Sequence, residues 1–168
     1  MTTGSITGLT EALHWQVEAT GGERLHVQVS GEVNENADFT ELGRQLRGDV
    51  TLLLDGITRI NSCGVREWVN FVRDLQLDSL RFARCSPVVV AQLNAIYNFR
   101  GPARVESFLA PYVCETCHVD EYKLLEVAEH FPDRALIHVP AFRCSRCGGI
   151  MTFDELPERY LAFLSEER

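Results

Sequence analysis

Four cysteines in the last third of the chain have the spacing of metal ligands. They form two Cys-x-x-Cys pairs, Cys114 with Cys117 and Cys144 with Cys147. Zn²⁺ binds four thiolates in a tetrahedron, and each pair can supply two of them from one tight turn. A shell of four cysteines leaves no position open for water, which a catalytic zinc ion requires. The spacing therefore predicts one structural zinc ion per chain.

The six cysteines of the chain could instead form disulfides, which occur mainly in secreted proteins. The N-terminus, however, has neither the basic stretch nor the apolar stretch of a secretory signal. The apolar runs are also too short to span a bilayer, which needs about 20 residues. We therefore expect a cytoplasmic protein, in which paired cysteines indicate a metal site.

The segment between the two cysteine pairs is longer than the spacer common in such sites. We expect it to form a hairpin from two strands, residues 122–127 and 135–139. The segment resembles a zinc ribbon, in which Gly148 and Gly149 would ease the turn after the second pair. Three nearby histidines are interpreted as ordinary residues, because four cysteines already complete the ligand set: His118, His130 and His138.

A final helix is predicted after the cysteines. Asp154 can cap its start, and apolar residues follow at helical spacing. They are Leu156, Tyr160, Phe163 and Leu164. We expect this apolar face to pack on the rest of the chain or, alternatively, on a second copy in a homodimer.

The first part of the chain alternates between strand and helix patterns. Residues 13–19 and 25–30 alternate apolar and polar side chains on either side of Gly21-Gly22, which predicts a hairpin. The apolar run at 51–55 is typical of a strand buried on both faces. The other predicted elements are helices starting near Asp38, Val65 and Ser86, and strands at 80–83 and 105–108.

This order, β-β-α-β-α-β-α-β, predicts an α/β fold with a mixed sheet and helices packed on it. The composition changes after Leu109, where the cysteine-rich part begins. We therefore divide the chain into a first domain, residues 1–110, and a small zinc-ribbon-like module with the C-terminal helix, residues 111–168.

One turn in the first domain has the properties of a binding site. Asn61, Ser62, Cys63 and Gly64 open a predicted helix, whose first N–H groups have no partner within the helix and whose dipole favours negative charge. A phosphate or carboxylate near Ser62 or Cys63 would be stabilised there. In the alternative interpretation, Asn61 and Ser62 only cap the helix.

Residues 11–110 resemble a STAS domain, the fold of bacterial anti-sigma-factor antagonists and of sulfate-transporter tails. The resemblance rests on Gly31-Glu32, on Leu-Leu-Leu-Asp-Gly-Ile at 52–57 and on the tetrapeptide 61–64. In the antagonists, an anti-sigma kinase phosphorylates the residue before the glycine, and the added charge breaks partner binding. Here Cys63 stands at that position, and Asn61 stands where the family has Asp.

The resemblance implies a signalling adaptor that binds a protein partner and is not an enzyme. The partner would be a signalling kinase, an anti-sigma-like protein or another regulatory protein, and Ser62 is the nearby residue that could accept a phosphate. The implied docking surface consists of Asn61, Ser62, Cys63 and Gly64, with Arg59 and Arg66 beside them. An alternative is a thiol-based redox or metal sensor that uses Cys63 or the zinc cysteines.

The charge of the chain argues against nucleic-acid and membrane partners. Its formal net charge is −8, with 10 basic and 13 acidic residues in 1–110 and 6 basic and 11 acidic residues in 111–168. Neither part has the basic excess that phosphate backbones or anionic lipids attract. A nucleic-acid-binding zinc ribbon is therefore a second, weaker alternative. The sequence also lacks the motifs of common catalytic sites.

Overall fold

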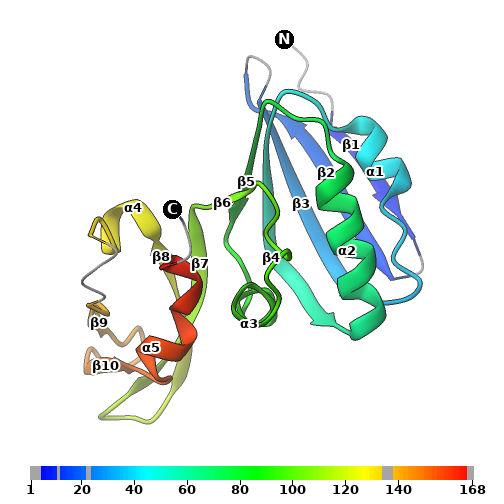
Figure 1. Cartoon of the computed structure of the whole chain (residues 1–168). Helices are drawn as coiled ribbons and strands as arrows, with labels where there is room; N and C mark the ends of the chain where they lie inside the picture. Colours follow the sequence, from blue (N-terminus) through cyan, green and yellow to red (C-terminus); the bar gives the residue numbers. More distant parts are fainter. Residues whose placement is uncertain (1–4, 11, 22–23, 134–137, 166–168) are drawn as a thin grey trace.

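The computed structural model describes residues 5–10, 12–21, 24–133 and 138–165. These residues form two sheets (Figure 1). One continuous hydrophobic core includes residues of both sheets. Sheet A has six strands in the order β1-β2-β3-β4-β5-β6, and sheet B has four in the order β8-β7-β10-β9. The fold is therefore mixed α/β with helices packed on a mixed sheet, as the sequence predicted.

Sheet A combines an antiparallel half with a parallel half. The strands β1 (Ser5–Leu9), β2 (Leu13–Ala19) and β3 (Arg24–Val33) are antiparallel neighbours. From β3 onward the strands are parallel: β4 (Asp49–Ile60), β5 (Ser79–Ala83) and β6 (Arg104–Val105). The predicted hairpin is confirmed in β2 and β3, and the predicted strand at 51–55 is the buried centre of β4.

Three helices connect the parallel strands: α1 (Thr40–Gln45), α2 (Ser62–Asp74) and α3 (Pro87–Ala95). Crossovers between neighbouring parallel strands are right-handed, which places successive helices on the same face of a sheet. Figure 1 shows α1 and α2 side by side over this face. None of the described helices is both long and apolar enough to span a membrane.

Trp68 of α2 is the centre of the core under these helices. Its indole ring is fully buried and lies 5.4–5.7 Å from the rings of Phe39, Phe82 and Phe99, measured between centroids. Its N–H donates to the Phe99 carbonyl at 2.9 Å, so burying the indole leaves no polar atom unpaired. The helices are thereby fixed on sheet A.

Sheet B is antiparallel throughout and consists of β7 (Ser107–Cys114), β8 (Asp120–Glu126), β9 (Phe142–Arg143) and β10 (Ile150–Phe153). The short helix α4 (Val127–His130) follows β8. The described chain ends with α5 (Pro157–Tyr160) and a 3-10 turn (Ala162–Leu164).

The two sheets meet where β7 begins. Phe108 forms an isolated parallel bridge with Cys85, two residues after β5, and its ring lies 5.3 Å from that of Phe163. The Asn94 side chain of α3 makes two hydrogen bonds to the backbone of the C-terminal segment. It donates to the Tyr160 carbonyl and accepts from the Phe163 N–H, both at 2.8 Å. The C-terminal segment therefore packs on the chain itself.

Three elements differ from the prediction. The strand expected at 105–108 is divided, because Arg104–Val105 pair with sheet A and the residues from Ser107 onward pair in sheet B. Residues 150–153, for which no strand was predicted, form β10, and the last helix begins at Pro157 instead of directly after the expected cap Asp154. The hairpin partner of β8 is β7; of the strand expected at 135–139, residues 135–137 lie outside the described residues, and His138 and Val139 are in no strand.

Candidate metal centre and helix-start surface

The four predicted cysteines come together in sheet B. Their sulfur atoms all lie within 4.8 Å of one another, with 3.5 Å between Cys114 and Cys147 and 3.7 Å between Cys117 and Cys144. A tetrahedral ion with four Zn–S bonds of about 2.3 Å holds its sulfurs about 3.8 Å apart, whereas a disulfide needs about 2.05 Å. The cluster therefore fits a single metal ion, and all four thiols are free.

The two Cys-x-x-Cys turns have the same backbone hydrogen bonds. In each turn, the residue after the second cysteine donates its N–H to the carbonyl of the first cysteine at 3.0 Å. The N–H two residues after the first cysteine points at that cysteine's sulfur, at 3.4 Å. Such N–H groups stabilise negative charge on sulfur, which a metal-bound thiolate carries.

The pKa values of the thiols reflect this arrangement. The backbone N–H groups of Cys117 and Thr116 lower the pKa of Cys114 to about 6. At Cys147 the Gly149 N–H also favours the thiolate, but the neighbouring sulfurs of Cys117 and Cys114 outweigh it and raise the pKa. Charge on one sulfur opposes ionisation of the next, so ionising all four thiols requires a cation among them.

One position distinguishes the two turns. The residue after the second cysteine has a left-handed backbone in both, with φ of 54° at His118 and 72° at Gly148. Glycine adopts this conformation freely, whereas a side chain there costs about 1–2 kcal/mol. The His118 side chain is not part of the cluster, as the sequence indicated, but its left-handed backbone is strained.

Replacing this histidine by glycine is expected to stabilise the protein. His118→Gly removes the strain of the left-handed backbone, and we expect the free energy of unfolding to rise by about 1 kcal/mol, less the larger entropy of glycine in the unfolded chain. Denaturant unfolding of the zinc-loaded protein measures the change. Gly148→Ala is the matched control and should lower the free energy of unfolding; a loss of stability in His118→Gly would contradict the strain.

Glu121 of β8 holds the second turn in place. One carboxylate oxygen accepts from the Ser145 N–H at 3.2 Å and from the Ser145 hydroxyl at 2.6 Å, and the other lies 2.5 Å from the Lys123 ammonium. The hydrogen bond from Lys123, followed by that from Ser145, lowers the pKa of Glu121 to about 2. Sequence reasoning missed this residue, because only the pairing of β8 with β7 brings it to the cluster.

The predicted helix-start turn lies at the end of β4, where α2 begins. The Asn61 side chain accepts from the Gly64 N–H at 2.8 Å and donates to Glu35 at 2.8 Å. The Asn61 hydrogen bond lowers the pKa of the Glu35 carboxyl. The expected capping by Asn61 is therefore confirmed, whereas Ser62 and Cys63 are exposed beyond the cap.

Gly64 is buried against the end of β3. A Cβ atom at this position would lie 1.9 Å from the Val33 carbonyl oxygen, so the start of α2 touches the backbone of the strand directly. The two predicted arginines flank the turn and are both exposed: Arg59 lies in β4, and Arg66 in α2 pairs with Glu67 at 3.2 Å. The six predicted residues thus belong to one stretch of chain with a fixed backbone at its centre.

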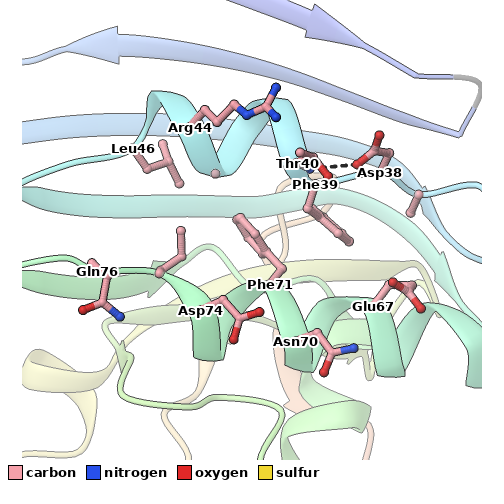
Figure 2. Close-up of a pocket in the computed structure, with 13 residues that line it drawn as sticks. Asp38, Phe39, Thr40, Arg44, Leu46, Glu67, Asn70, Phe71, Asp74 and Gln76 are labelled. Atoms are coloured by element: carbon pink, nitrogen blue, oxygen red, sulfur yellow. Dashed lines mark hydrogen bonds between the residues drawn. The ribbon is translucent and has the colours of Figure 1, made fainter.

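A groove of about 470 Å³ lies between α1 and α2, and sequence reasoning did not identify it (Figure 2). The rings of Phe39 and Phe71 stack beside it, 4.7 Å apart and nearly parallel. Glu67, Asn70 and Asp74 of α2 line one side of it. Gly43 of α1 also lines the groove, and a Cβ atom there would lie 3.7 Å from the Phe71 ring.

Comparison of the chain with protein-family models, with curated proteins and with solved structures gives no significant match.

Proposed function

We propose that this chain is a non-enzymatic signalling adaptor, which binds a regulatory protein through the start of α2 and is stabilised by a structural zinc ion. The observation that carries the proposal is the exposed Ser62-Cys63 pair, whose backbone is held by a helix cap on one side and by close contact with β3 on the other. The Asn61 cap and the contact of Gly64 with Val33 fix that backbone. A rigid, exposed element loses little conformational entropy on binding, which favours its use in an interface.

The STAS resemblance of the sequence adds a reason to place the interface there. The arrangement of sheet A, three antiparallel strands followed by parallel strands with helical crossovers, is compatible with that resemblance. With Cys63 before the glycine, the adaptor binds without the usual phosphorylation switch or is regulated at Ser62. A phosphate on Ser62 would add about two negative charges to the surface that meets the partner.

The proposed metal is zinc. Cys114, Cys117, Cys144 and Cys147 supply four sulfur ligands at tetrahedral spacing, and a set of four thiolates selects zinc or iron over oxygen-preferring cations. The ion would supply no chemistry beyond holding the two turns together, because its coordination is complete. The role assigned to it is therefore the stability of sheet B.

The adaptor proposal is tested with a Ser62→Asp variant. Affinity capture from the native cell lysate, read by mass spectrometry, compares the wild-type protein, Ser62→Asp and the control Ser165→Asp, which adds the same charge at another exposed serine. We expect one partner to be retained by the wild type and the control and to be reduced at least about tenfold with Ser62→Asp.

Two other results would count against this placement. A partner retained equally by all three proteins would exclude the start of α2 as the interface. The absence of any partner would count against an adaptor and favour the thiol-sensor alternative. Rapid alkylation of Cys63 at neutral pH, with Cys63→Ser as its control, would then support that alternative.

A further inference from the structure

At one edge of sheet B, the strand β8 pairs with a neighbour on one side only, among the described residues. β8 pairs with β7 on one side and is the last strand of the sheet within the described residues. It is seven residues long. An edge strand of this length presents a row of backbone N–H and C=O groups that can pair with another strand.

The outer face of sheet B is apolar next to this edge. The register of β7 and β8 places Tyr122 opposite Pro111 and Leu124 opposite Leu109 on the same face. Tyr122 is 62% exposed and Leu124 is 39% exposed, whereas the opposite face carries the buried Tyr112 and Cys114. Exposed apolar side chains gathered on one sheet face are typical of an interaction surface.

The charges on the inner face of β8 favour one register for pairing with a second β8 strand. Glu121 and Lys123 lie two residues apart on this face, on either side of Tyr122, and form an ion pair with each other within the chain. In an antiparallel pair of two β8 strands centred on Tyr122, Glu121 of each copy faces Lys123 of the other. Centring the pair on Glu121 or Lys123 would place two like charges opposite each other, which is destabilising.

We propose that two copies of this chain associate through β8, antiparallel and with the twofold axis at Tyr122. The interface is isologous, because the same residues contribute from both copies. It joins the two copies of sheet B into one continuous sheet and places the two exposed Tyr122 side chains opposite each other on its outer face. Each Leu124 then lies diagonally beside Tyr122 of the other copy. Because the contact is small, we expect a dissociation constant in the range of about 1–100 μM.

The proposed register makes a specific prediction for position 124. In this register, residue 124 of each copy lies opposite Asp120 of the other copy, on the exposed face. Leu124→Asp therefore places two carboxylates opposite each other twice per dimer, and we expect the dissociation constant to rise at least about tenfold. Leu124→Lys removes the same apolar side chain but faces Asp120 with a positive charge, so its dissociation constant should equal or fall below that of the wild type.

Sedimentation equilibrium of the full, zinc-loaded chain measures the three dissociation constants. Zinc content and the midpoint of thermal unfolding check that both variants fold, since position 124 is exposed. Opposite effects of the two substitutions would support the register. Equal weakening by both would indicate contact through the apolar face without strand pairing, no change in either would place any dimer elsewhere, and a monomer at about 1 mM would exclude self-association; each of these overturns the proposal.

Discussion

Removal of the metal from the four cysteines is expected to unfold sheet B while sheet A stays folded. Sheet B is small: β9 has two residues and β10 has four, and three of the four cysteine ligands follow β7 in turns without other covalent support. Structural zinc contributes about 10–16 kcal/mol to folding in zinc-finger peptides, far more than such short strands provide. Sheet A keeps the aromatic contacts of Trp68 with Phe39, Phe82 and Phe99, none of which involves a residue of sheet B.

The two tryptophans of the chain make the separation measurable. Trp15 and Trp68 are both buried in the sheet A part, so their fluorescence should change little when a chelator is added. Hydrogen exchange in residues 107–126 should instead rise by orders of magnitude. Elemental analysis of protein purified without a histidine tag should give about one zinc per chain.

A cysteine substitution gives the same test without a chelator. Cys117→Ser should abolish stoichiometric zinc and lower the free energy of unfolding of sheet B by at least about 3 kcal/mol. Cys63→Ser is the matched control, because Cys63 is exposed and outside the cluster, and it should change neither quantity. Protein that contains no metal and yet protects sheet B from exchange would exclude a structural metal.

The second large effect is expected from a single methyl group at the start of α2. Gly64→Ala places a Cβ atom 1.9 Å from the Val33 carbonyl oxygen and 2.8 Å from the Asn34 nitrogen. Both neighbours are backbone atoms of the adjoining strand and loop, so the helix itself must move. We expect a loss of about 3 kcal/mol or more in the free energy of unfolding, although alanine has the higher helix propensity by about 1 kcal/mol.

Another helical glycine is the control for this substitution. At Gly43 in α1, a Cβ atom would lie 3.7 Å from the Phe71 ring, an ordinary contact. Gly43→Ala should therefore show the helix propensity alone and stabilise the protein by up to about 1 kcal/mol. Denaturant unfolding of the two variants should give opposite signs, and a stabilising Gly64→Ala would contradict the close approach of α2 to β3.

Local sequence patterns predicted most of sheet A and the metal cluster. The alternation in 13–19 and the apolar run at 51–55 reflect which faces of these strands are buried. Each pattern is complete within a few consecutive residues, so it can be read from the sequence alone. The helical stripe that includes Trp68 predicted α2 for the same reason. The cysteine pairs were predicted because their spacing is a property of one tight turn.

The features that the sequence did not reveal depend on pairing across the fold. β1 carries the exposed side chains Ile6 and Leu9, so its pattern lacks the alternation of a half-buried strand. Residues 150–153 have apolar positions that suit a helix or a strand, and only pairing with β7 makes them a strand. Glu121 and the groove beside Phe71 likewise require neighbours that are remote in sequence.

The position of β7 in the chain has a consequence for the order of events during synthesis. All strands of sheet A precede residue 106, so this sheet can form as soon as its segment leaves the ribosome. Cys114 and Cys117 emerge next, but the other ligand pair follows only at Cys144 and Cys147. The nascent chain therefore carries half a metal site beside a finished sheet while about 30 further residues are added, which takes about 2–6 seconds at about 5–20 residues per second. Binding of the proposed metal ion would then be the late step of biogenesis, and a shortage of the ion would leave molecules whose first half is native and whose second half is exposed to proteases.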